Sequence, residues 1–325
     1  MSERRQRVSL TVLIAFGANL LIAVAKSAAG AITGSASMVA EAAHSWADTG
    51  NEIFLMIAER RARRPQDPAH PLGYGREAYV WSLFAALGLF VAGSAVSIMH
   101  GIQSLTDPEP ATNFAVAYVV FAIALVLEGT SFRQAYRQVR RGAKESGRDL
   151  LEHAIATSDP TLRAVFAEDF AAVLGILIAS GGVLAHQLTG SPVPDAIGSI
   201  LVGLLLGVVA IILVDRNRRF LVGVEVSAAV RARVVEALLA VPEVSRVTQL
   251  HIEFVGPRQV YLVATLDLVG DEVESHVGAR LRALEERIET TPSVIRAVLT
   301  VAAPDAPDLD LGLGARAGDG GHAGD

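Results

Sequence analysis

Long apolar segments recur along this 325-residue chain and constrain its fold more than any other feature. The hydrocarbon core of a bilayer is about 30 Å thick, so a helix of about 20 mostly apolar residues can cross it. The composition agrees, because 51% of the residues are hydrophobic and the mean hydropathy is +0.42. We therefore predict an α-helical membrane protein with six transmembrane helices. The predicted spans are Val8–Ile32, Ser37–Ala58, Tyr79–Ile102, Phe114–Phe132, Leu162–His186 and Pro194–Val214.

Lysine and arginine residues gather at alternate ends of these spans. The loops around Gly34, residues 107–110 and residues 190–194 contain neither residue type. By the positive-inside rule, both termini of a multi-pass protein are then cytoplasmic. No transit-peptide composition is evident, so we expect the cytoplasmic membrane of a bacterial cell. The basic residues are Arg4, Arg5 and Arg7, then Arg60, Arg61, Arg63, Arg64 and Arg76, then Arg133, Arg137, Arg140, Arg141, Lys144 and Arg148, and finally Arg216, Arg218 and Arg219.

The composition changes to that of a soluble domain near residue 221. "SAAVRARVVEALLAV" has helical periodicity, whereas "VTQLHIEFV" alternates like a strand. A second strand, a second helix and a third strand follow, which predicts a small cytoplasmic α+β domain of order αββαβ, ferredoxin-like, with both helices on one face of the sheet. The predicted divisions are a transport domain over 1–220, this domain over 221–303, and a disordered tail rich in Gly, Asp and Pro over 304–325.

The composition also excludes several classes of protein. There are no cysteines, so disulfides, thiolate metal sites and thiol catalysis are absent. The net charge of −6 and the pI near 5.8 argue against nucleic-acid binding. Any metal site must therefore be built from histidine and carboxylate side chains.

The second predicted span carries a stripe of polar residues. Glu41, His44, Asp48 and Asn51 are three or four residues apart and share one helix face. A charged side chain at the bilayer centre costs roughly 2.5–3.5 kcal/mol on insertion scales, so such residues usually serve a function. His44 and Asp48 are one turn apart and can grip one divalent ion such as Zn²⁺.

The fifth predicted span offers the further ligands that a tetrahedral site needs. Glu168 and Asp169 stand there in an otherwise apolar run. The alternative is that intramembrane polar residues only join helices by hydrogen bonds. That alternative applies best to isolated residues such as Asn19, Lys26 and Glu128.

Three motifs in this order resemble the cation diffusion facilitator family. They are "EAAHSWADTGNE", "PQDPAHPLGYGREAYVWSL" and "DAIGSILVGLLLG". The resemblance covers roughly Val8 to Ala303 and implies six spans, cytoplasmic termini and a C-terminal αββαβ domain. It also implies a homodimer that exchanges Zn²⁺ or a related divalent ion for protons, with His44 and Asp48 as transport-site ligands.

The fifth span departs from the common pattern of that family. Most members have His or Asp followed four residues later by Asp, whereas this chain aligns Glu168 with the first position and Ala172 with the second. Asp169 is adjacent to Glu168, and neighbouring helical residues diverge by ~100°. We expect Glu168 to be a ligand and Asp169 to be a ligand or a proton carrier. This Glu-Asp variant resembles the branch that contains the mitochondrial zinc exporters of animals.

Asp67 and His70 form a possible second metal site. They lie in the cytoplasmic loop in which some relatives bind another ion. The alternative is a loop shaped only by Pro68, Pro71 and its glycines. The two explanations carry similar weight.

The function predicted from the sequence is efflux of a divalent metal cation, with Zn²⁺ expected and Mn²⁺, Fe²⁺, Co²⁺ or Cd²⁺ as alternatives. The mechanism would be proton-coupled antiport by alternating access, and the partners would be the metal ion, protons, the lipid bilayer and a second copy of the chain. No cofactor is expected besides the transported ion. Enzyme activity is not expected, since the His-Glu-x-x-His motif, the Gly-x-Ser-x-Gly elbow and a phosphate-binding glycine loop are all missing. The alternatives are a membrane-anchored metal sensor or scaffold and a membrane metalloenzyme.

Overall fold

The computed structural model of the protein describes residues 10–108, 112–146 and 148–310. It forms two compact units, one made of Met1–Arg61 with Glu77–Arg218 and the other of Ala62–Arg76 with Arg219–Asp325. The loop 62–76 thus groups with the C-terminal unit, although the sequence placed it within the transport domain. The predictions for Arg4, Arg5 and Arg7 and for the tail beyond residue 310 lie outside the described residues.

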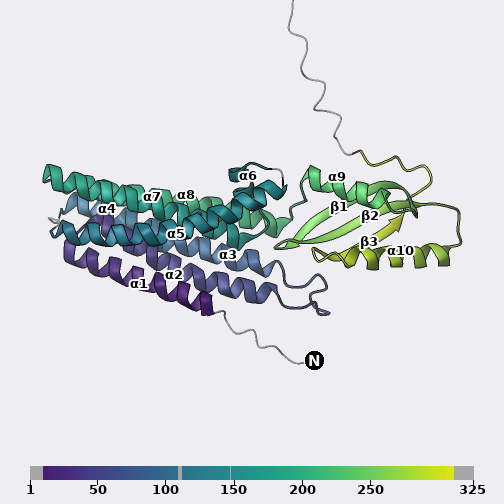
Figure 1. The fold of residues 1–325 in the computed structure, drawn as a ribbon, viewed down its shortest axis with the longest axis horizontal. Coiled ribbons are helices and arrows are strands. Elements are labelled where there is room, and N and C mark those ends of the chain that lie inside the picture. Colours follow the sequence, from purple (N-terminus) through teal and green to yellow (C-terminus); the bar gives the residue numbers. More distant parts are fainter. Residues whose placement is uncertain (1–9, 109–111, 147, 311–325) are drawn as a thin grey trace, which may run out of the picture. The chain divides into compact units, whose positions relative to one another are not determined.

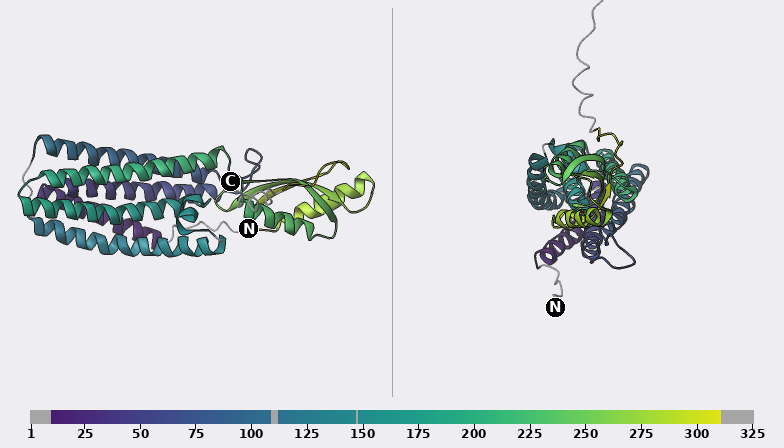
Figure 2. Two further views of the ribbon diagram at one scale, coloured as in Figure 1. Left: turned by 90° about the horizontal axis from the view of Figure 1, so that it is seen from above. Right: turned by 90° about the vertical axis from the view of Figure 1, so that its right-hand side faces the viewer.

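Most helices of the first unit are long and run side by side (Figures 1 and 2). Helices α3 and α4 are joined by the π-helical stretch η1 into one continuous helical segment. A π-helical turn inside an α-helix widens it locally and is common near functional sites. The elements are α1 (Leu10–Thr33), α2 (Ala36–Ala62), α3 (Glu77–Gly88), η1 (Leu89–Ala95), α4 (Val96–Thr106), α5 (Phe114–Ser146), α6 (Leu150–Ala156), α7 (Pro160–Thr189) and α8 (Val193–Val222).

Within the described residues, four helical segments are long and apolar enough to cross a membrane. They are Phe16–Thr33, Glu77–Thr106, Phe114–Lys144 and Val193–Val222. Helices α2 and α7, with 27 and 30 residues, are also long enough, but they carry the ionisable residues of the candidate site. The chain therefore has a helical transmembrane domain with four candidate spans by length and composition.

Small residues allow helices α4 and α8 to approach closely. A Cβ added to Gly101 would lie 2.6 Å from Cγ1 of Ile200, and one added to Gly203 would lie 2.7 Å from Cγ1 of Ile98. Close packing at small residues is a common way of joining helices in a bilayer, where no hydrophobic effect drives them together. These glycines therefore fix the spacing between the two helices.

The C-terminal unit has the predicted order αββαβ. Its elements are α9 (Ala228–Leu239), β1 (Val244–Gly256), β2 (Gln259–Leu268), α10 (Glu274–Glu289) and β3 (Val294–Val301). The strands form a mixed three-stranded sheet of order β1-β2-β3, in which β1 pairs antiparallel with β2 and β2 pairs parallel with β3 (Figure 1). Antiparallel strands can be joined by a tight turn, whereas a parallel pair needs a crossover, which α10 supplies here.

Alternate residues of the strands build the core of this unit. Ile252, Leu262 and Ala297 face one another across the three strands, and all three are buried in one apolar cluster. Leu238 of α9 and Leu284 of α10 belong to the same cluster. Both helices therefore cover this face of the sheet, because successive side chains of a strand point to opposite faces.

The segment after β3 begins in contact with β1. The backbone nitrogen of Leu309 donates a hydrogen bond to the carbonyl oxygen of Val247 at 3.0 Å. Arg246 contacts Asp267 at 2.9 Å and donates to the carbonyl oxygen of Ala306 at 3.0 Å. Ala306 and Leu309, which lie within the predicted tail, therefore contact β1.

Candidate metal site

The polar stripe predicted in the second span lies on one buried face of α2. Glu41, His44 and Asn51 are all buried, and Asp48 keeps 16% of its side chain exposed. Trp46 is exposed, as its place outside the stripe requires. The stripe therefore faces other helices of the unit.

Asp195 of α8 fixes the beginning of α2. Its Oδ2 accepts a hydrogen bond from the backbone nitrogen of Ala36 at 2.8 Å, and its Oδ1 accepts from the backbone nitrogen of Ser37 at 3.2 Å. The hydroxyl of Ser35 also donates to Oδ1, at 3.0 Å. A carboxylate at a helix N-terminus satisfies free N–H groups and complements the helix dipole. Asp195 thereby fixes the position of the N-terminus of α2, the helix that carries the stripe.

His44 and Asp48 form the pair that the sequence predicted. Nε2 of His44 lies 3.5 Å from Oδ2 of Asp48. Within the described residues, neither ring nitrogen of His44 has a hydrogen-bond partner, and Oδ1 of Asp48 has none either. Buried polar atoms normally have partners, so such free atoms call for an explanation. An imidazole and a carboxylate with unused lone pairs can coordinate a divalent cation.

Glu168 and Asp169 point to different neighbours. Oε1 of Glu168 accepts a hydrogen bond from Nδ2 of Asn51 on α2 at 3.0 Å. Oδ2 of Asp169 accepts one from the hydroxyl of Ser131 on α5 at 2.7 Å. The two carboxylates therefore diverge, as adjacent positions on a helix should. Only Glu168 is bonded to the helix that carries His44 and Asp48.

Helix α7 runs antiparallel to α2 along the stripe. Asn51 contacts Glu168, whereas Oε1 of Glu41 lies 2.5 Å from the position that a Cβ of Gly175 would occupy. Residue numbers therefore decrease along α2 in the direction in which they increase along α7. His44 lies between the two contacts on α2, and Ala172 lies between them on α7. Ala172 is buried, and it is the residue that the resemblance aligns with the second aspartate of the common family pattern.

The four predicted ligands do not all meet at one point in this structure. Asp48 lies on the face of α2 that contacts Glu168 through Asn51. In the described ranges, however, no three His, Asp or Glu side chains lie close enough together to hold one metal ion. The structure brings together His44 with Asp48, and Asn51 with Glu168.

Asp67 and His70 also lie together, but in a tight turn of the loop. Oδ1 of Asp67 accepts hydrogen bonds from the backbone nitrogens of Ala69 at 3.0 Å and His70 at 2.8 Å, and it lies 3.3 Å from Nδ1 of His70. The hydroxyl of Tyr74 donates to Oδ2 at 2.6 Å. The Tyr74 hydrogen bond, followed by those from His70, holds the pKa of Asp67 below its ordinary value. Both oxygens of the Asp67 carboxylate therefore already accept hydrogen bonds from residues of the same loop.

Several polar contacts of the helical unit could not be assigned from the sequence. Asn51 was part of the stripe, but its bond to Glu168 joins residues 117 positions apart. Lys26 on α1 binds Oε2 of Glu41 at 3.0 Å. Asn19 on α1 donates to Oε1 of Glu52 at 2.6 Å. The only sequence signal for these contacts was a polar residue inside an apolar run.

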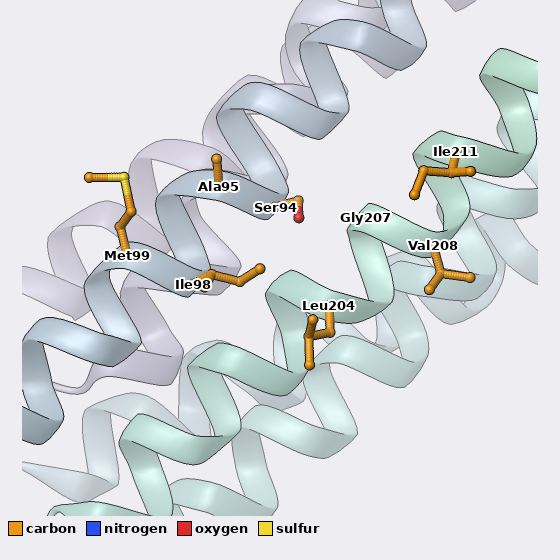
Figure 3. Close-up of a pocket in the computed structure, with 8 residues that line it drawn as sticks. All are labelled: Ser94, Ala95, Ile98, Met99, Leu204, Gly207, Val208 and Ile211. Atoms are coloured by element: carbon orange, nitrogen blue, oxygen red, sulfur yellow. The ribbon is translucent and has the colours of Figure 1, made fainter.

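An apolar pocket of about 400 Å³ lies between the η1–α4 segment and α8 (Figure 3). Ile98, Met99, Leu204 and Val208 line it, together with Ser94 and Gly207. A bare divalent cation requires oxygen, nitrogen or sulfur ligands of suitable charge. This pocket has no charged side chain in its lining, so it does not serve as the ion site.

Residues 12–222 match the family profile of the cation efflux transmembrane domain. "Metal tolerance protein C4" of Arabidopsis thaliana is 37% identical over 236 residues, which cover 73% of this chain and 52% of that protein. "Proton-coupled zinc antiporter SLC30A9, mitochondrial" of Mus musculus is 34% identical over 259 residues, which cover 80% of this chain and 46% of that protein.

The chain spans about half the length of these two relatives, 52% and 46%. "Uncharacterized transporter MJ0449" of Methanocaldococcus jannaschii is 23% identical over 301 residues, which cover 91% of this chain and 98% of that protein. The family match extends from α1 to the end of α8 and includes the stripe and both candidate acids of α7. The chain therefore belongs to the cation efflux family, also called the cation diffusion facilitators, whose members are transmembrane transporters and not enzymes.

Proposed function

We propose that the protein exports Zn²⁺ across a membrane in exchange for protons. The observation that carries this proposal is the buried pair of His44 and Asp48, whose free lone pairs lie along the face of α2 that contacts Glu168. Two related proteins support the choice of ion, one named as a zinc antiporter and the other as a metal tolerance protein.

His44, Asp48 and Glu168 are the proposed ligands. An ion bound to His44 and Asp48 would draw in Glu168, whose Oε2 would bind the metal while Oε1 keeps its hydrogen bond from Asn51. Asp169 is held by Ser131 toward α5 and is proposed as a proton carrier or an additional ligand. Metal ions and protons compete for the same imidazole and carboxylate groups, so binding of one releases the other. Alternating access to the two sides of the membrane then couples the two fluxes.

The proposal includes the placement of the chain in its membrane. Helices α2 and α7 would cross the bilayer with the four apolar segments, giving six spans in total. Their charged groups would face the interior of the bundle, where intramembrane ionisable residues are tolerated. From the basic residues at alternate helix ends we propose that both termini lie in the cytoplasm, and the proposed location is the cell membrane. A homodimer is the proposed assembly, with the C-terminal unit as its ferredoxin-like cytoplasmic domain.

Zinc flux into proteoliposomes with an imposed pH gradient tests the proposal. Purified Asp48→Ala should show no zinc flux above protein-free vesicles, because the ion loses one of its ligands in the buried pair. Trp46→Phe is the matched control, since it lies on the same helix outside the stripe. Zinc flux by Asp48→Ala at the wild-type rate would exclude this site.

Single alanine variants of Glu168 and Asp169 rank the acids of α7. Glu168→Ala should reduce zinc flux more than Asp169→Ala, because Glu168 lies against α2 whereas Asp169 is bonded to α5. Equal losses would indicate a shared site. A fully active Glu168→Ala would reverse the ranking.

A further inference from the structure

A fully buried ion pair joins α1 to α2 beside the candidate site. Nζ of Lys26 lies 3.0 Å from Oε2 of Glu41, and both side chains are completely shielded from solvent. Removing one partner of a buried ion pair leaves an uncompensated charge, so such pairs are costly to break. The sequence offered only an interhelical contact as the explanation for Lys26, and that role alone does not require a charged pair.

The position of Glu41 connects this pair to the candidate site. Glu41 precedes His44 by three residues on the same buried stripe of α2. Its second oxygen, Oε1, has no hydrogen-bond partner within the described residues. That oxygen lies against Gly175 of α7, where a Cβ would come within 2.5 Å of it. The absent side chain of Gly175 makes room for the carboxylate at the contact between α2 and α7.

The charge of Lys26 lies close to the His44–Asp48 pair. Its ammonium group is bound to Glu41, which precedes His44 by one helical turn on the same buried face of α2. Charges buried in a protein are screened far less by solvent and salt than charges at the surface. A fixed cation at this position therefore opposes any second cation that binds to His44 and Asp48.

We propose that Lys26, held in place by Glu41, is a resident positive charge that limits the affinity of the His44–Asp48 site for its divalent ion. This inference rests on the proposed transport function. A carrier must release the ion that it binds, and a nearby fixed cation speeds release by weakening the bound state. Lys26 acts on the ion through space and is not itself a ligand.

The test compares two variants that differ only in the charge of Lys26. Glu41→Gln keeps the lysine without its partner, whereas Lys26→Met/Glu41→Gln lacks both charges and leaves no unpaired carboxylate. Zinc binding to the full-length protein in detergent is measured by titration calorimetry. The double variant should bind Zn²⁺ about tenfold or more tightly than Glu41→Gln, because it lacks the opposing charge. Equal dissociation constants for the two variants would overturn the inference.

The single variant Lys26→Met adds a second comparison. It should bind Zn²⁺ more tightly than the wild type and release it more slowly to a chelator in stopped-flow measurements, whereas Glu41→Gln should bind it more weakly. A purely structural contact predicts weaker binding in both single variants, with a lower melting temperature in each. Changes of the same sign would therefore contradict the proposed role of Lys26.

Two controls separate this inference from the proposed function. Trp46→Phe removes the hydrogen bond of 3.0 Å between Trp46 and Ser27, which also joins α1 to α2 but carries no charge. Its zinc affinity should equal that of the wild type. Asp48→Ala reports on the site itself. If the wild type and Asp48→Ala bind zinc equally, the proposed site fails; if only the Lys26 comparison shows no effect, the site stands and the inference alone fails.

Discussion

Two His–Asp pairs occur in this chain, and they differ in their surroundings. On α2, His44 and Asp48 are four residues apart, with a contact of 3.5 Å and side-chain exposures of 0% and 16%. In the loop 62–76, Asp67 and His70 are three residues apart, with a contact of 3.3 Å and exposures of 39% and 49%. Residue type, spacing and distance are therefore similar in the two pairs.

The difference between the pairs is in how their polar atoms are satisfied. Asp67 accepts hydrogen bonds from two backbone nitrogens and from Tyr74, which together stabilise a turn. The α2 pair is buried in a helix face and, among the described residues, leaves both nitrogens of His44 without a hydrogen-bond partner. The turn of the loop accounts for the exposed and hydrogen-bonded groups of Asp67 and His70. Buried groups with unused lone pairs call for another partner, and a cation would supply it.

Exchanging each histidine for alanine should give the largest difference between the pairs. His44→Ala should weaken zinc binding by more than about 100-fold, because loss of a direct ligand should exceed the 10–100-fold typical of outer-shell partners. His70→Ala should leave the dissociation constant within about threefold, since the turn around Asp67 is already satisfied without an ion. Titration calorimetry with Zn²⁺ on both purified variants gives the comparison.

The opposite result would reverse the assignment of the two pairs. If His70→Ala lost high-affinity zinc binding and His44→Ala kept it, the loop would hold the principal site. Melting temperatures of both variants serve as the folding control. A loss of binding counts only for a variant whose unfolding transition is preserved.

Asn51 should have an intermediate effect, because it touches Glu168 and is not a proposed ligand. Asn51→Ala removes the hydrogen bond of 3.0 Å to Oε1 of Glu168. Loss of such a supporting partner typically reduces metal affinity by about 10–100-fold. The matched variant Ser131→Ala removes the 2.7 Å bond to Asp169 and should have a smaller effect on zinc affinity. A larger effect of Ser131→Ala would identify Asp169 as the principal acid of α7.

Local sequence patterns were sufficient for much of the fold. The order αββαβ follows from alternation in strands such as β2, where Leu262, Ala264 and Leu266 are buried. The long apolar helices were predictable from the length of the apolar segments in the sequence. The placement of the loop 62–76 was not predictable from local patterns. This loop groups with the C-terminal unit, in which Arg76 forms an ion pair with Glu253. Residues so far apart in the sequence leave no local signal of their contact.

The candidate site was likewise predictable from the sequence only in part. The pairing of His44 with Asp48 was predictable, since residues four apart on a helix are neighbours. The bond between Asn51 and Glu168 and the support of α2 by Asp195 were not, because each depends on the packing of distant helices. The divergence of Glu168 and Asp169 was predictable from helix geometry, but the helix that each would face was not.

The smallest expected effect concerns the exposed pair and its tyrosine. Tyr74→Phe removes the 2.6 Å hydrogen bond to Oδ2 of Asp67, so the pKa of Asp67 should rise toward its ordinary value. A carboxyl whose pKa is lowered by folding stabilises the folded loop above its unfolded pKa, and this stabilisation is lost as the pH falls through the folded pKa. The variant should therefore lose part of the loop's stability at neutral pH and show less dependence on pH in the acidic range.

NMR titration of the ¹³C-labelled Asp67 carboxyl in the detergent-solubilised protein measures this shift, and Tyr261→Phe on β2 is the control for loss of a hydroxyl elsewhere in the same unit. Zinc added at neutral pH should leave the Asp67 resonance of the wild type unchanged if the turn alone accounts for the pair. A saturable shift in that resonance, abolished in His70→Ala, would instead show that the loop binds an ion. In that case hydrogen-bond satisfaction would not distinguish the two pairs, and the reason for assigning transport to α2 alone would be lost.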